Sequence, residues 1–82
     1  MSPPADNRDA MTLRVRITEP SLLPDLVDLL LRSGCVAHVV GDDSCIVVHV
    51  QARDAEEAWC EVAFFVRAWH AQHPDLGAVL TR

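Results

Sequence analysis

The chain predicts a single α+β domain in which strands and helices follow one another in the order βαββαβ. Apolar residues recur at strand spacing in four segments and at helical spacing in two segments between them. Glycine, proline or aspartate marks the junctions between these segments. The pattern fills residues 11–82, which we expect to form one domain. It leaves residues 1–10, a polar stretch that we expect to be a disordered tail.

The first strand is expected between Met11 and Thr18. Apolar and polar residues alternate here, which is typical of a strand with one buried face. Arg14 and Arg16 lie on its polar side. The side chains expected in the core are Leu13, Val15 and Ile17.

The first helix is expected after Pro20. Ser21 is its expected N-cap, and Gly34 is expected to end it, because glycine readily adopts the left-handed conformation of a helix C-terminus. Between them, apolar residues recur at helical spacing: Leu23, Leu26, Val27, Leu30 and Leu31.

Two further apolar runs, Cys35–Val40 and Cys45–Val50, are expected to form a β-hairpin. With Asp42 and Asp43 as the central residues of a tight turn, Val40 pairs with Cys45. The set expected to pack on the helices is then Cys35, Ala37, Val39, Ile46, Val48 and Val50. The opposite face carries Val36, His38, Val40, Cys45, Val47 and His49. A shift of one residue would exchange the faces of one strand, and the complete apolarity of the first set decides the assignment.

The second helix is expected to begin at Asp54, with Glu57 completing a capping box, and to end at His73-Pro74. Its apolar stripe consists of Ala55, Ala58, Trp59, Val62, Phe65, Val66 and Trp69. Phe64 points away from this stripe. The last strand is expected over Leu76–Thr81.

This order of elements is that of a ferredoxin-like βαββαβ sandwich. It predicts a four-stranded antiparallel sheet of order 4-1-3-2 with two helices on one face. The first and third strands would be central, and the second and fourth would form the edges. The other face of the sheet would remain open for binding.

Composition excludes several classes of function. The formal net charge of −5 disfavours general binding to nucleic acid or to an anionic membrane, since both require a cationic surface. The N-terminal residues lack the pattern of a secretory signal, and the three cysteines form no short paired motif. We therefore expect a cytoplasmic protein with free thiols and no cofactor.

The expected open face gathers most of the candidate site residues: Arg14, Arg16, Val36, His38, Val40, Cys45, Val47 and His49. His38 would lie diagonally from both Cys45 and His49, at roughly 7–8 Å between α-carbons. Because no third ligand accompanies the two histidines, we expect no metal site. We also expect no catalytic activity, since no nucleophile with an oriented base can be assembled. The alternative is a small enzyme, or a thiol- or metal-dependent protein, that uses Cys45, His38 and His49.

Three segments resemble the start of an ACT-like domain: Thr18–Leu23, Asp25–Leu30 and Gly34–Val36. The resemblance implies the same βαββαβ order over residues 11–82. It also implies pairing of two copies through sheets or helices, with an amino acid or another small effector bound at the interface. Ser21 occupies the place, in the loop after the first strand, where that family often has glycine.

These observations lead to one expected function. The chain is a stand-alone, non-catalytic binding module that forms a homodimer and binds a partner protein or a small effector at the subunit interface. Two surfaces compete for the subunit contact. One is the open face of the sheet, and the other surrounds Phe64 on the second helix.

Overall fold

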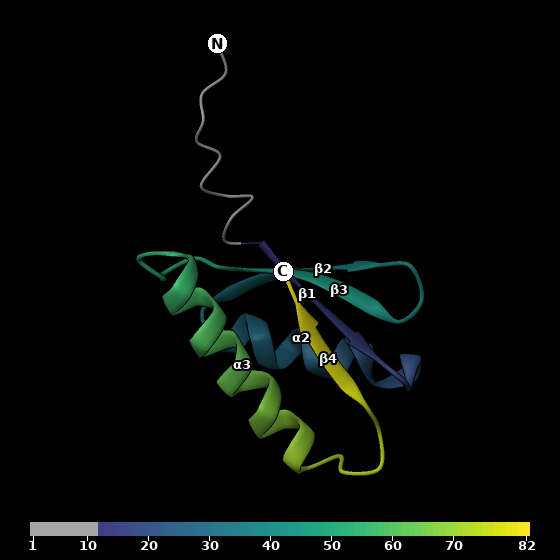
Figure 1. Cartoon of the computed structure of the whole chain (residues 1–82). Helices are drawn as coiled ribbons and strands as arrows, with labels where there is room; N and C mark the ends of the chain where they lie inside the picture. Colours follow the sequence, from purple (N-terminus) through teal and green to yellow (C-terminus); the bar gives the residue numbers. More distant parts are fainter. Residues whose placement is uncertain (1–11) are drawn as a thin grey trace.

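A computed structural model describes residues 12–82; the segment expected to be a disordered tail, 1–10, lies outside the described residues. The elements follow the predicted order (Figure 1). They are β1 (Thr12–Ile17), a 3-10 helix (Pro20–Leu22), α2 (Leu23–Arg32), β2 (Cys35–Val40), β3 (Ser44–His49), α3 (Ala55–Ala71) and β4 (Ala78–Thr81). Among residues 12–82, no helix is both long enough and apolar enough to cross a bilayer.

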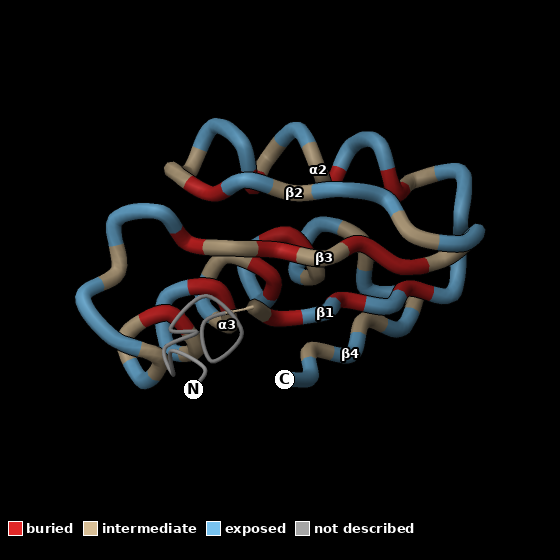
Figure 2. Tube along the Cα trace, turned by 90° about the horizontal axis from the view of Figure 1, so that it is seen from above, coloured by how far each residue is buried: buried red, intermediate tan, exposed pale blue. Residues whose placement is uncertain are grey.

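The four strands form one sheet in which every neighbouring pair is antiparallel. The strand order is β2-β3-β1-β4, which is 4-1-3-2 when it is read from the β4 edge. β1 and β3 are therefore central, and β2 and β4 form the edges. Both helices lie on the same side of the sheet (Figure 1). Seen from above, α2 runs alongside β2, and α3 lies toward the other edge (Figure 2). The α+β architecture with a four-stranded antiparallel sheet is confirmed.

The core lies between the sheet and the two helices. β1 contributes Leu13, Val15 and Ile17, as predicted. The helices contribute Leu23, Leu26 and Leu30 from α2, and Ala58, Val62, Val66 and Trp69 from α3. Trp69 also joins the helices through a hydrogen bond, because its Nε1–H donates to Oδ2 of Asp25 at 2.8 Å. The sheet and the two helices remove their apolar side chains from water where they meet, and this burial stabilises the domain.

The register of the β2–β3 hairpin differs from the predicted one by one residue. Val40 pairs with Ser44, and Val39 pairs with Cys45. The turn therefore contains three residues, Gly41-Asp42-Asp43, and Gly41 has a φ of 69° that favours glycine. β2 keeps its predicted faces, whereas those of β3 are exchanged. The placement of Cys45, Val47 and His49 on the open face was wrong: all three are buried against the helices.

The physical reason for this error is the composition of β3. Ile46 and Val48 are as apolar as Cys45 and Val47, so alternation alone could not decide which pair faces the helices. The prediction relied on His49 being too polar for the core. In the structure the cost of burying this imidazole is offset by a carboxylate partner on α3.

Two helix starts were predicted, with different outcomes. Asp54 is the N-cap of α3, as predicted, and its Oδ1 accepts the N–H of Glu57 at 2.8 Å. Ser21 is not the N-cap of α2; Leu22 occupies that position without a side-chain cap. The Ser21 hydroxyl instead donates to Oε2 of Glu19 at 2.8 Å.

The last strand, β4, begins at Ala78, two residues later than predicted.

Candidate functional site

The sheet face opposite the helices carries side chains from all four strands. Strand pairing places these residues on it: Thr12, Arg14, Arg16, Val36, His38, Val40, Ser44, Ile46, Val48, Val79 and Thr81. In the described part of the chain, no helix covers this face (Figure 1). Of the predicted site residues it brings together Arg14, Arg16, Val36, His38 and Val40. We call it the open face.

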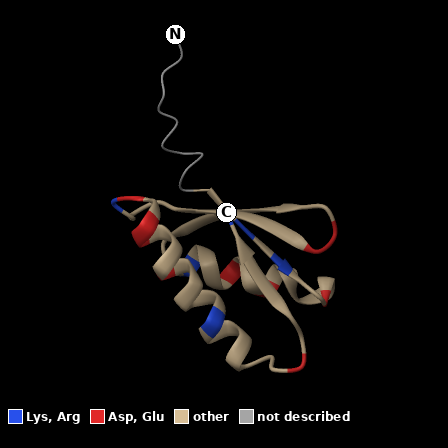
Figure 3. Ribbon diagram, in the orientation of Figure 1, with Lys and Arg blue, Asp and Glu red and all other residues tan. Residues whose placement is uncertain are grey.

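The open face combines apolar rows with a basic strand at the centre. Figure 3 shows basic residues on β1 and acidic residues in the hairpin turn. Nε of Arg16 lies 3.8 Å from Oδ2 of Asp43, whereas Arg14 forms no ion pair with residues 12–82. Two shallow hollows of about 390 and 260 Å3 flank Arg14. The face can therefore contact an apolar surface that also carries a negative charge.

The structure does not support the alternative function based on a thiol and an imidazole. His38 lies on the open face, whereas Cys45 and His49 lie on the opposite face of the sheet. Burial raises the pKa of the Cys45 thiol to about 11, so that this group is not a nucleophile near neutral pH. His38 and His49 cannot share a metal across the sheet. Within residues 12–82, no three histidine, cysteine or acidic side chains gather as metal ligands would.

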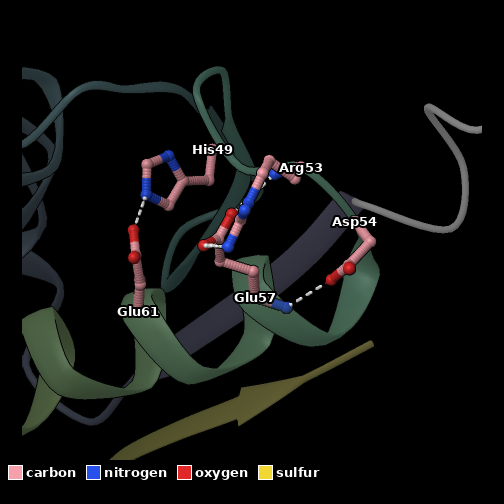
Figure 4. Close-up of polar contacts among 5 residues, drawn as sticks. All are labelled: His49, Arg53, Asp54, Glu57 and Glu61. Atoms are coloured by element: carbon pink, nitrogen blue, oxygen red, sulfur yellow. Dashed lines mark hydrogen bonds and ion pairs between the residues drawn. The ribbon is translucent and has the colours of Figure 1, made fainter.

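His49 is the polar residue that the register shift brings into the core. Its Nε2 lies 2.5 Å from Oε1 of Glu61 on α3 (Figure 4). Its ring also contacts Phe65, with the two ring centroids 5.8 Å apart. The second ring nitrogen, Nδ1, is buried and has no hydrogen-bond partner among the described residues. The pair therefore fixes β3 against α3 rather than offering an accessible catalytic group.

The N-terminus of α3 is held by a second polar group (Figure 4). Asp54 caps the helix, and the Glu57 carboxylate accepts the backbone N–H of Arg53 at 2.7 Å. The Arg53 guanidinium adds a longer contact of 3.4 Å to the same carboxylate. The backbone N–H and then the guanidinium of Arg53 lower the pKa of Glu57. This cluster explains why the helix begins there.

The outer edge of β2 presents backbone groups that have no hydrogen-bond partner among residues 12–82. The N–H of Val50 donates to the carbonyl of Gly34, so this residue pair is a hydrogen-bonded one. Because hydrogen-bonded and non-bonded pairs alternate along an antiparallel ladder, Val36, His38 and Val40 direct their backbone groups to β3. Cys35, Ala37 and Val39 consequently direct theirs outward, away from the sheet.

Apolar side chains accompany this edge on both faces of the sheet. Val36 is 42% exposed on the open face, and Val39 is 52% exposed on the helix side. Leu31 of α2 is 51% exposed. The Asp25 side chain, which bonds Trp69 of α3, marks the side of α2 that faces α3. Because each residue of a helix is rotated by about 100° from the last, Leu31 lies on the opposite side of the buried stripe of α2. It therefore lies on the side of α2 that faces away from α3. We call Leu31, Val36 and Val39, together with the outward backbone groups of β2, the β2 margin.

The remaining predicted site residues lie apart from the β2 margin. Phe64 is 64% exposed on the solvent side of α3, as predicted, and its ring contacts that of Phe65 edge-on. Ser21 lies in the 3-10 helix between β1 and α2, where its hydroxyl donates to Oε2 of Glu19. The described structure does not bring either residue to the open face.

The prediction from sequence missed the partner of His49. Glu61 lies three residues after Ala58 and one before Val62, next to the buried stripe of α3. A carboxylate at such a position is a signal that a buried cation or imidazole faces it.

No protein-family model matches the chain, and no curated protein or solved structure is significantly similar to it.

Proposed function

We propose that this domain is a non-catalytic binding module that acts as a homodimer, with two copies paired along β2. The observation that carries the proposal is the β2 edge itself. Ala37 and Val39 direct outward backbone groups that no other described residue bonds, and exposed apolar side chains lie beside them. Pairing with a second β2 satisfies these groups and joins the two sheets into one of eight strands.

The sequence of β2 supports this proposal because it lacks the usual protection of an edge. Lysine, proline, a bulge or very short length normally prevents an edge strand from pairing with a strand of another chain. The six residues of β2 include no proline and no aspartate, glutamate, lysine or arginine. The opposite edge, β4, has only four residues. The β2 edge is therefore the more favourable one for strand pairing.

A two-fold axis through Ala37 satisfies this geometry. Antiparallel pairing about Ala37 places the outward backbone groups of one copy opposite the outward backbone groups of the other. An axis through Val36 or His38, whose backbone groups bond β3, would not place them so. The exposed Leu31 side of α2 would meet the same side of a second α2 beneath the joined sheets. Val36 would extend the apolar surface of the two open faces across the junction.

The joined open faces supply the binding surface. The ferredoxin-like arrangement and the resemblance to an ACT-like domain support a small effector or a partner protein as the ligand. Arg14 supports an acidic one, because it lies on the central strand of this face, beside Ile46 and Thr81, and forms no ion pair with residues 12–82. A raised melting temperature with one amino acid from a panel would identify such an effector, since ligand binding stabilises the folded state.

Light scattering across a concentration series tests the homodimer. The matched variants are Val39→Lys and Val79→Lys, which place one lysine on opposite edges at residues that are 52% and 57% exposed. We expect a dimer whose dissociation constant Val39→Lys raises by at least about tenfold, because each lysine would lie opposite Cys35 of the second copy and would bring a charge into the apolar junction. Val79→Lys should leave the dimer intact.

Two outcomes would reject the proposal. A monomer at high micromolar concentration would remove the homodimer. A dimer that Val79→Lys dissociates and Val39→Lys does not would place the contact on the open face or the β4 edge, away from β2.

A further inference from the structure

A groove of about 240 Å3 lies between α3 and β4, at the edge of the sheet farthest from β2. Small residues face each other across it, Ala63 from α3 and Ala78 from the start of β4. Their short side chains leave the space open. Val66 and Leu80 complete an apolar lining that is continuous with the core.

The ends of the groove are aromatic and basic. Trp59 lines one end, and the Arg82 guanidinium carbon lies 4.9 Å from the centroid of its ring. Arg67 and His70 line the groove as well. Nε2 of His70 donates to the carbonyl of Leu76 at 2.6 Å, which fixes that ring beside the groove.

The charges around the groove contrast with those of the whole chain. The protein has a net charge of −5, yet no aspartate or glutamate lines this groove. Within residues 12–82, Arg67 and Arg82 form no ion pair, whereas Arg16, Arg32 and Arg53 each contact a carboxylate. Unpaired guanidinium groups beside an apolar hollow are complementary to an anion with an apolar body.

The geometry points to a binding site for a small organic carboxylate with an aromatic or branched aliphatic body. The body would lie against Trp59 and between the two alanines, and the carboxylate would bond the guanidinium of Arg67, since that of Arg82 already lies over the Trp59 ring. The volume limits the ligand to a small one, since typical ligand pockets begin at about 300 Å3. This site is independent of the homodimer, because β4 and β2 are opposite edges.

Titration of the full chain with 3-phenylpropionate, followed by amide and indole NMR signals, tests the site. We expect a saturable shift at Trp59, Ala63 and Arg67, with a dissociation constant on the order of 1 mM for a ligand of this size. The matched neutral probe, 3-phenylpropionamide, should bind roughly tenfold more weakly because it lacks the charge. Acetate, which lacks the body, should give no saturable shift.

Variants separate the two halves of the site. Arg67→Gln removes one exposed guanidinium and should weaken binding of 3-phenylpropionate by roughly tenfold. Arg32→Gln is the control, because it removes the same charge from α2 and should leave binding unchanged. Ala63→Leu should fill the groove and abolish binding, with its amide spectrum reporting that the chain is folded.

Three results would overturn the proposal. The first is the absence of a saturable shift with 3-phenylpropionate up to about 20 mM, some twentyfold above the expected dissociation constant. The second is equal affinity for the amide and the carboxylate. The third is an equal change in affinity in Arg32→Gln and Arg67→Gln. Because none of these readouts depends on the oligomeric state, failure here leaves the homodimer to be judged by light scattering alone.

Discussion

His49 on β3 and Glu61 on α3 meet at 2.5 Å, between Nε2 of the imidazole and Oε1 of the carboxylate. The histidine side chain is 5% exposed and that of the glutamate 48% exposed, so the pair lies where the core meets solvent. Nδ1 of His49 already lacks a partner among the described residues. Glu61 is therefore the group that makes burial of the imidazole tolerable.

Removing this carboxylate should destabilise the fold. Glu61→Ala leaves both nitrogens of a buried imidazole without a partner, which costs about 1–3 kcal/mol. Urea unfolding measures the change in the free energy of unfolding. Glu56→Ala, on the exposed side of the same helix, is the control and should cost under about 0.5 kcal/mol. Equal losses in the two variants would show that the His49–Glu61 contact does not stabilise the domain.

The three cysteines should differ in reactivity. Cys60 is exposed on α3, whereas Cys35 and Cys45 are buried. Burial raises the pKa of Cys45 to about 11, and burial together with the nearby Glu61 raises that of Cys35 to about 11. At pH 8, Cys60 should therefore be alkylated first and the other two only after unfolding in urea. Mass spectrometry of time points checks this order, and rapid native labelling of Cys45 would contradict the observed register.

The same thiols predict a loss of stability at alkaline pH. Their folded-state pKa values are about 11, above the ordinary value of 9.0 that applies when the chain is unfolded. A raised pKa contributes stability below pH 9, and this contribution is lost as the pH rises from 9 to 11, because only the unfolded thiols ionise there. Unfolding free energies measured over this window should fall. Cys45→Ala should flatten the decline, and Cys60→Ser should not alter it.

The cap of α3 predicts a substitution with a conservative control. Asp54→Ala removes the oxygen that accepts the Glu57 N–H and should cost about 1 kcal/mol. Asp54→Asn retains an acceptor and should cost much less. Thermal unfolding of the two variants compares these effects. If Asp54→Asn lost as much stability as Asp54→Ala, the charge rather than the hydrogen bond would be responsible.

Much of the fold could be predicted from local patterns. β1 alternates cleanly, so Leu13, Val15 and Ile17 were assigned to the core correctly. The stripe of α3 and its cap at Asp54 were equally clear, because helical spacing and capping depend on residues close in sequence.

The register of β3 could not be predicted in the same way. Both faces of this strand are apolar, and the deciding contact, between His49 and Glu61, joins residues on different elements. One extra residue in the turn therefore exchanged Cys45, Val47 and His49 with their neighbours. The groove beside Trp59 was also not predicted, since it depends on Ala63 and Ala78 facing each other across α3 and β4.

Amide hydrogen exchange at the β2 edge tests the homodimer most directly. In an isolated chain the N–H groups of Ala37 and Val39 point to solvent, whereas those of Val36 and His38 bond β3. We predict that Ala37 and Val39 are protected at high protein concentration, to a degree similar to Val36 and His38, and lose that protection on dilution. Rapid exchange of Ala37 and Val39 at every concentration, with Val36 and His38 still protected, would contradict pairing along β2.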